Sequence, residues 1–374
     1  MGKSADMLRH ATPFLLGVAA TLVCLTFYRS KIIIGGHERS LEAFALINAT
    51  QVNSTNIACE KKEVASFDDR LISRKEVVNQ TTVQNATPVE EEPFPGLLPL
   101  LKRVATNDKT VIMTSVNEAW ATPNSLLDIF LEGFRIGEGI QHLLDHLIVV
   151  TLDPNAWNLC TAVHPHCYPL TVDGKNFTSE KVFMSGDYID LVWSKVKLQR
   201  RILELGYNFL FTDVDILWMR NPLKHITVYA DLTASSDEFL GDPDDINNYP
   251  NTGLIYVKST QKTIEMMNYW IDARNRYPPN HEQTIFNFIK ADLAGNLTVK
   301  IQYIDTSYCG GFCNHGNDLN KICTMHANCC VGLQAKLHDL KQIIEDWKFY
   351  TALPIEEKRK GLFTWRVPGL YCMH

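Results

Sequence analysis

The segment that most constrains the fold is an apolar run that ends in two aspartates, Asn208-Phe-Leu-Phe-Thr-Asp-Val-Asp215. In a β-strand, residues at positions i and i+2 point to the same face. Asp213 and Asp215 can therefore be directed at one point while Val214 turns back toward the core. Two carboxylates this close repel each other unless a cation or a proton lies between them. A divalent metal bound to a phosphate-bearing ligand is the usual occupant, so we expect both aspartates to be metal ligands.

Strands and helices alternate from about residue 96 onward. Short apolar runs predict further strands at Thr110–Ser115, His146–Leu152, Tyr229–Ser235 and Gly253–Val257. Helical spacing predicts helices at Ser125–Phe134, Ile189–Leu205, Thr263–Arg274 and Gln283–Lys290. Asn124 is the expected N-cap of the first of these helices, and Gly206 is expected to end the second. Continuous apolar strands separated by helices predict a Rossmann-type α/β fold, a mostly parallel sheet with helices on both faces.

In such sheets, ligands bind beyond the carboxyl ends of the strands. Polar residues follow two of the predicted strands, and these candidates are Thr114, Ser115, Asn117 and Asp153. Lys195, on the helix before the acidic strand, is expected to reach the same site, although an ordinary helix-surface lysine is the alternative. Asp237 and Asp242–Asp245 form an acidic stretch that we interpret as a solvated loop rather than a second metal site.

The N-terminal region predicts a membrane anchor. Residues 12–28 carry no charge and are mostly apolar, and a helix of this length spans about 25 Å. We therefore expect a cytoplasmic tail at 1–11, a signal anchor at 12–28 and a flexible glycosylated stem at 29–95; a cleaved signal peptide is the alternative. Four glycosylation sequons crowd the stem, so the rest of the chain is expected to face a lumen; they begin at Asn48, Asn53, Asn79 and Asn85. Two single sequons lie further on, at Asn176 and Asn296.

Composition indicates which kinds of partner the chain binds and which cellular compartment it occupies. The net charge is −6 and no long basic block occurs, which disfavours nucleic-acid binding. Ten cysteines in a lumenal protein favour disulfides, with Cys160 and Cys167 as a plausible local pair. The last six cysteines allow 15 pairings, which sequence does not distinguish. A zinc cluster is the alternative for four of them, Cys309, Cys313, Cys323 and Cys329.

Four segments carry a family resemblance. Gly206–Pro222 resembles the D-x-D segment of plant nucleotide-diphospho-sugar transferases, glycosyltransferase family 77, and Asn251–Val257, His281–Asn287 and His326–Gly332 are similar in order and spacing. The resemblance runs from about residue 108 to about residue 350. It implies a GT-A fold for a catalytic domain at 96–374, in a single-pass type II Golgi membrane protein whose catalytic domain is lumenal. It also implies a UDP-sugar donor, Mn²⁺ or Mg²⁺, and retention of anomeric configuration.

The resemblance also implies roles for single residues. His326 would complete the metal shell, and its imidazole suits Mn²⁺ better than Mg²⁺. Lys336 would neutralise the departing diphosphate. Glu282 and Gln283 are the catalytic candidates; Glu282 departs from the Asp that related enzymes often carry, which leaves open which of the two faces the anomeric carbon.

The remaining candidates would bind the donor. Thr114, Ser115, Asn117 and Asp153 would hold the nucleotide, while Gly253, two residues after Asn251, would allow close backbone approach to the sugar or acceptor. A plain turn would explain Asn251 and Gly253 almost as well.

The predicted function is therefore transfer of a sugar from a UDP-sugar to a cell-wall glycan or glycoprotein, with a pentose such as arabinose or xylose as the expected sugar. Two alternatives remain. One is a non-catalytic lumenal binding protein of the same fold. The other is a D-x-D phosphohydrolase, which is disfavoured because Ile216 and Leu217 stand where small or hydroxyl residues are expected.

Overall fold

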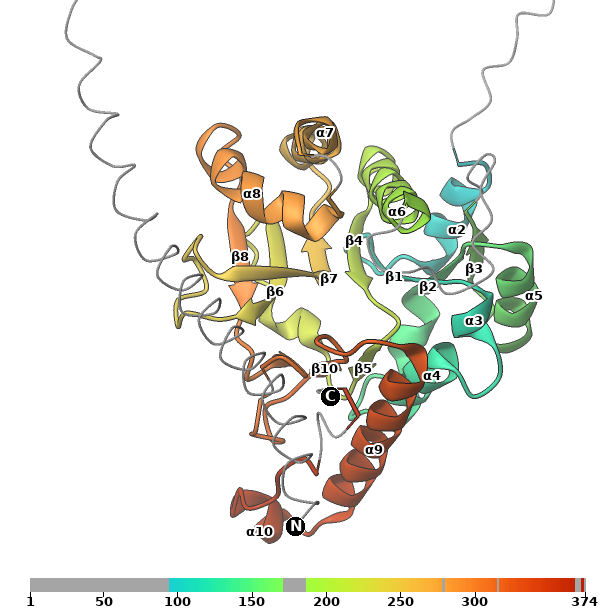
Figure 1. The fold of residues 1–374 in the computed structure, drawn as a ribbon, viewed down its shortest axis with the longest axis vertical. Helices are drawn as coiled ribbons and strands as arrows, with labels where there is room; N and C mark the ends of the chain where they lie inside the picture. The colour runs from blue at the N-terminus through green and yellow to red at the C-terminus, as the bar shows by residue number, and fades with distance from the viewer. Residues whose placement is uncertain (1–93, 171–185, 278–279, 315, 367–370, 373–374) are drawn as a thin grey trace, which may run out of the picture. The chain divides into compact units, whose positions relative to one another are not determined.

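The computed structural model describes residues 94–170, 186–277, 280–314, 316–366 and 371–372 (Figure 1). The predicted tail, the predicted membrane span and nearly all of the predicted stem lie outside these residues, as does the sequon at Asn176. Among the helices of the described ranges, none is long and apolar enough to cross a membrane.

A seven-stranded sheet with the order β3-β2-β1-β4-β7-β6-β8 forms the centre of the fold. Its strands are β1 (Thr110–Val116), β2 (Leu147–Thr151), β3 (Cys167–Pro169), β4 (Asn208–Thr212), β6 (Leu232–Glu238), β7 (Tyr249–Val257) and β8 (Ile301–Ile304). All neighbours are parallel except that β7 runs antiparallel to both β4 and β6. The sheet is therefore mostly parallel, as predicted. The short connection at 239–248 explains the reversal of β7, since a parallel crossover needs a dozen or more residues.

Helices cover both faces of this sheet, as predicted (Figure 1). One face carries α2 (Leu97–Val104), α6 (Gly186–Glu204), α7 (Gln261–Arg276) and α8 (Glu282–Gly295). The other carries α4 (Leu126–Ile136), α5 (Pro154–Val163) and α9 (Leu333–Ala352). Shorter helices are α3 (Glu118–Ala121), η1 (Gln141–His146), η2 (Pro222–His225) and α10 (Ile355–Arg359). Alternate residues of β1 enter the two separate cores, since Ile112 joins one and Met113 the other.

A second, three-stranded sheet connects the acidic segment to the C-terminal part of the chain. Its order is β5-β10-β9, with β5 at Ile216–Trp218, β9 at Cys309–Gly311 and β10 at Thr324–His326. The register sets His326 opposite Ile216 on one side and Gly311 on the other. Because β5 begins directly after Asp215, this pairing brings His326 beside the aspartates.

Several predicted boundaries are wrong. β6 begins at Leu232 rather than Tyr229, whose side chain is exposed, and β7 begins four residues before Gly253. Ser125, not Asn124, occupies the N-cap position of α4, although its side chain makes no capping hydrogen bond, and Asn124 takes a left-handed φ of 66°. Gly206 does follow the end of α6 with a φ of +84°, the conformation that favours glycine at a helix terminus.

Within the ranges that the structure describes there are three disulfides: Cys160–Cys167, Cys313–Cys329 and Cys330–Cys372. The first is the predicted local pair. The second removes two of the four sulfurs that the zinc alternative requires, so that alternative is wrong. Cys309 and Cys323 are buried thiols, and burial raises the pKa of Cys323 to about 11.

Candidate metal centre

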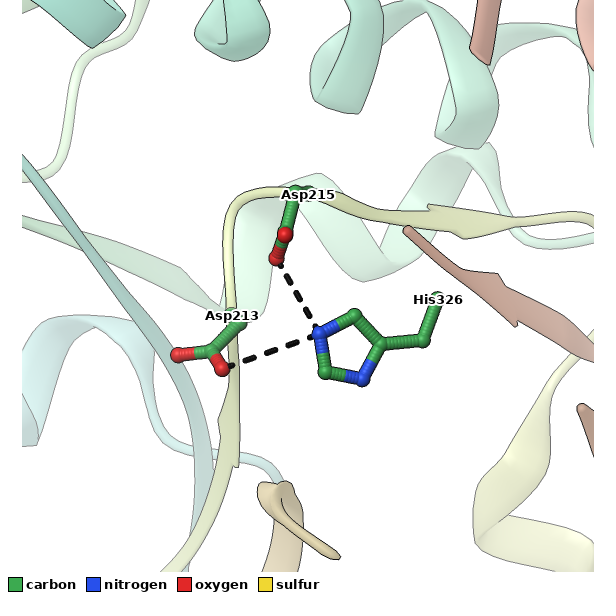
Figure 2. Close-up of side chains that lie close together, drawn as sticks. All are labelled: Asp213, Asp215 and His326. Carbon is green, nitrogen blue, oxygen red and sulfur yellow. Dashed lines mark ion pairs between the residues drawn. The ribbon is translucent and has the colours of Figure 1, made fainter. Parts of the chain in front are cut away.

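Three side chains converge where the two sheets meet (Figure 2). Asp213, Asp215 and His326 each offer one ligand atom, and these atoms lie within 4.8 Å of one another. His326 Nε2 lies 3.3 Å from Asp215 Oδ1 and 3.9 Å from Asp213 Oδ2. Two carboxylate oxygens and one imidazole nitrogen form a donor set that suits Mn²⁺ and similar divalent ions.

The backbone around the aspartates differs from the predicted strand. β4 ends at Thr212, and Asp213 and Asp215 lie in the turn that leads to β5. Asp213 N donates to Gly253 O at 2.7 Å, and Ala327 N donates to Asp215 O at 3.0 Å. These bonds fix the turn between β7 and the end of β10. Val214 is buried, as predicted. Because the two aspartates lie in a turn rather than in a strand, the turn directs them to the same side, not strand alternation.

The absence of a side chain at Gly253 leaves room for the metal-ligand triad of Asp213, Asp215 and His326. A Cβ atom at this position would lie 2.6 Å from Asp213 Oδ2, 2.7 Å from His326 Cε1 and 2.8 Å from Asn251 Oδ1. Asn251 Oδ1 also accepts a 2.9 Å hydrogen bond from Gly253 N. The site therefore needs glycine for its missing side chain rather than for its backbone freedom, because the φ of Gly253 is not left-handed.

Two lysines bring positive charge to the site. Lys336 Nζ, on α9, lies 2.6 Å from Asp215 Oδ2. Lys195 Nζ, on α6, lies 3.0 Å from Glu282 Oε1 and 4.0 Å from Asp213 Oδ1. Three carboxylates therefore face two ammonium groups, which leaves one net negative charge when His326 is neutral.

These contacts shift the ionisation of the site. Burial works against the charge on Asp215, yet the Lys336 ammonium and the His326 ring hold the pKa of this carboxyl below its usual range. Burial also opposes the charge on Glu282, but the Lys195 ammonium and His281 together outweigh it and lower the pKa of Glu282 to about 2. Partial burial raises the pKa of Asp213, and Lys195 opposes this. Glu282 thus forms a buried ion pair.

Asp237 is the centre of an amide cluster beside the triad. Its Oδ1 accepts from Asn251 Nδ2 at 2.8 Å and Asn328 Nδ2 at 2.7 Å, and its Oδ2 accepts from Gln283 Nε2 at 3.3 Å. Gln283 Oε1 in turn accepts from Thr252 N at 3.1 Å. The prediction that Asp237 belongs to a solvated loop is therefore wrong, because two register shifts in β6 and β7 bring its carboxylate over the neighbouring strand.

A polar pocket lies between the two sheets next to the triad. It is lined by residues of β6, β7, β9 and β10 and their ends, among them Ser235, Ser236, Asp237, Asn251, Gly310, Gly311, His326 and Asn328. Sequence reasoning missed Asp237 and Asn328. Asp237 lies near the end of β6 and Asn328 lies two residues after β10, and a polar residue near a strand end is the signal that identified Asp213.

Two of the residues at the ends of the first two strands, Asn117 and Asp153, cap helices of the scaffold. Asn117 accepts from Trp120 N and caps α3, while Asp153 caps α5 and also accepts from Glu118 N at 2.8 Å. Thr114 Oγ1 is buried with no hydrogen-bond partner within the described part of the chain, and Ser115 is half-buried. β1 is the neighbour of β4, so these residues lie at the same sheet edge as the aspartates. Their contact with a nucleotide stays a prediction.

Comparison with known proteins adds to this geometry. Residues 142–340 match a family described as nucleotide-diphospho-sugar transferase. An uncharacterized protein of Arabidopsis thaliana is 40% identical over 286 residues, 76% of this chain and 76% of the relative. A second uncharacterized Arabidopsis thaliana protein is 37% identical over 266 residues, 69% of this chain and 79% of the relative. The Arabidopsis thaliana arabinosyltransferase RRA1 is 24% identical over 257 residues, 61% of each chain.

Proposed function

The chain belongs to the nucleotide-diphospho-sugar transferase family and is a glycosyltransferase, and we propose that it is a metal-dependent, retaining enzyme that uses a UDP-pentose donor. The observation that carries metal dependence is the convergence of Asp213, Asp215 and His326 within 4.8 Å. The missing Cβ of Gly253 leaves room beside their ligand atoms. Two oxygens and one nitrogen leave coordination positions for diphosphate oxygens on Mn²⁺ or Mg²⁺.

Charge balance supports a diphosphate as the second occupant. The net charge of −1 from three carboxylates and two lysines becomes +1 with a divalent cation alone. A diphosphate then restores a negative total, so cation and diphosphate stabilise each other in the partly buried site. When bound, the metal acts as a Lewis acid that stabilises negative charge on the leaving diphosphate.

The side chains of this chain supply the rest of the proposed mechanism. Lys336 and Lys195 lie where their ammonium groups neutralise developing charge on the diphosphate. The donor sugar would lie over the mouth of the pocket beside the triad, with Asp237 and its amide partners as hydrogen-bonding groups for the hydroxyls. Of the two catalytic candidates, the geometry favours Gln283, because it belongs to the amide cluster whose members line this pocket. Glu282 acts through Lys195, which its carboxylate holds at 3.0 Å.

The proposed sugar and acceptor rest on similarity. The relation to arabinosyltransferase RRA1 supports arabinose as the sugar. Xylose as the other pentose, and a cell-wall glycan or glycoprotein as acceptor, rest on the resemblance of the sequence motifs to family 77. Transfer with retention rests on the resemblance of the D-x-D and His326 segments to family 77.

The cellular setting is proposed from the sequence and from the disulfides. The three disulfides suit an oxidising lumen, and the sequon asparagine Asn296 is exposed at the end of α8. We place the chain in the Golgi membrane as a type II protein anchored through residues 12–28. Protease protection of sealed microsomes should leave the part after the anchor intact; digestion of that part would refute this orientation.

Donor hydrolysis tests the proposed activity. The purified full chain is incubated with UDP-arabinofuranose, UDP-xylose, UDP-galactose and UDP-glucose, with Mn²⁺ and with a chelator. We expect release of UDP from a pentose donor only with metal, and no release by Asp215→Ala. Unchanged turnover by that variant would refute the metal role, whereas a preference for a hexose donor would refute only the proposed sugar.

A further inference from the structure

An exposed disulfide lies directly beside the proposed sugar pocket. Cys313 follows β9 and Cys329 follows β10, three residues after His326, and both half-cystines are exposed. The bond therefore closes the open end of the β9–β10 pair. Cys329 takes a left-handed φ of 52°, which is unfavourable for a non-glycine residue and persists only where the surroundings impose it.

One side chain of the pocket, that of Asn328, contacts the backbone of the disulfide. Asn328 immediately precedes Cys329, and its Oδ1 accepts a 3.1 Å hydrogen bond from Cys313 N. A backbone N–H is only a donor, so this bond fixes the orientation of the amide and turns Nδ2 toward Asp237. Asn328 Nδ2 then donates to Asp237 Oδ1 at 2.7 Å, a charge-assisted bond. Both ends of the Asn328 amide thus depend on where Cys313 lies.

The strands alone hold this arrangement weakly. β9 and β10 contain three residues each, and they pair in parallel. Beyond the strands, Phe312 N donates to His326 O at 2.9 Å. Gly311 is required for the fit, because a Cβ there would lie 2.4 Å from Asn328 Oδ1. The disulfide is the covalent connection that continues this pairing past Asn328.

We propose that the Cys313–Cys329 disulfide is a positioning element of the active site, which holds Asn328 against Asp237 and so orders the amide cluster that includes Gln283. This proposal rests on the proposed transferase function. The position of His326 does not depend on the disulfide in the same way, because β10 is also paired with β5. The disulfide therefore affects the sugar-binding side of the site more than the metal side.

The test compares Cys313→Ser/Cys329→Ser with Cys160→Ser/Cys167→Ser in the full chain. The control removes a disulfide that joins α5 to β3, an edge strand of the large sheet, and its sequence separation is 7 residues against 16 for Cys313–Cys329. We expect the first variant to lose about tenfold in kcat for UDP-arabinofuranose hydrolysis, the lower range for loss of a supporting contact. Its affinity for UDP with Mn²⁺, measured by calorimetry, should stay within about twofold of the unmodified chain, and the control should change neither quantity.

A double-mutant cycle tests whether the disulfide acts through Asn328. Asn328→Ala should lower kcat about as much as the disulfide variant, and combining the two should add less than about twofold, because both remove the same contact. Hydrogen exchange of the peptide 309–332, measured without substrate, should speed up in the disulfide variant independently of turnover.

Three outcomes would overturn the proposal: unchanged kcat in Cys313→Ser/Cys329→Ser, additive losses in the cycle, or equal losses of kcat and UDP affinity. Failure of the unmodified chain to bind UDP with Mn²⁺ would instead refute the transferase proposal. In that case, unchanged hydrogen exchange in the variant would still refute the positioning role.

Discussion

Replacement of Gly253 by alanine is the smallest change that should remove the metal site while keeping the fold. The added Cβ would lie 2.6 Å from Asp213 Oδ2, which is 0.8 Å short of the 3.4 Å at which ordinary contact begins (3.4 − 2.6). The same atom would lie 0.7 Å too close to His326 Cε1 (3.4 − 2.7). Metal sites tolerate ligand displacements of about 0.2 Å, so two of the three ligands would leave their positions.

The expected result is a selective loss. Affinity for Mn²⁺ in the presence of UDP should fall by at least about tenfold, the lower range for disturbance of a metal shell. Alanine is otherwise acceptable here, because the backbone of Gly253 is not left-handed and β7 is a strand in which glycine is unfavourable. The free energy of unfolding should therefore fall by no more than about 2 kcal/mol, the lower part of the cost of overpacking a site.

Calorimetric titration of Mn²⁺ at saturating UDP, together with urea unfolding, measures both quantities. Gly295→Ala is the matched control, since nothing lies within 4 Å of a Cβ at that position and it ends α8. This control should bind UDP and Mn²⁺ as the unmodified chain does. If Gly253→Ala binds them with unchanged affinity, the triad is not the metal site.

Three further predictions concern the charged groups. Glu282→Gln should lower the free energy of unfolding in urea by about 3 kcal/mol, because it leaves the Lys195 ammonium buried without its partner. If Lys195→Met/Glu282→Gln recovers this free energy, the loss is due to the unpaired charge of Lys195. Because the pKa of Glu282 falls from 4.5 to about 2 on folding, its contribution to the free energy of unfolding is complete above pH 4.5 and is lost as the pH falls toward 2. This acid-dependent loss, on the order of 3 kcal/mol, should be missing in Glu282→Gln. Lys336→Met should strengthen Mn²⁺ binding without nucleotide, because an ammonium 2.6 Å from Asp215 no longer repels the ion, and should weaken UDP binding; weaker Mn²⁺ binding would contradict this charge balance.

The sequence predicted the parts of the fold that depend on local patterns. β1, β2 and β4 are continuous apolar runs, and such runs identify a covered parallel sheet without knowledge of the rest of the chain. The direction of β7 was missed, because an apolar run reads the same whichever way the strand runs. Its first four residues were missed because they pair with β6 through irregular register rather than regular alternation.

The residues of the candidate site also fall into two groups, those that a local segment reveals and those that only the folded chain brings together. Asp213 and Asp215 are neighbours, so their chemistry was visible in one short segment. His326 and Lys336 came from family resemblance, since nothing local connects them to β4. Asp237 was taken for a solvated acid because bulges, which the sequence does not reveal, decide where its carboxylate points.

The contact between Lys336 and Asp215 joins positions 121 residues apart. During synthesis from the N-terminus, the two aspartates therefore leave the ribosome long before the groups that balance their charge. Closing so long a loop is entropically costly, and contacts of this kind form late in folding. A nascent or truncated chain that stops short of β10 would carry an exposed acidic turn but no assembled centre, so competence for chemistry requires synthesis through β10 and α9.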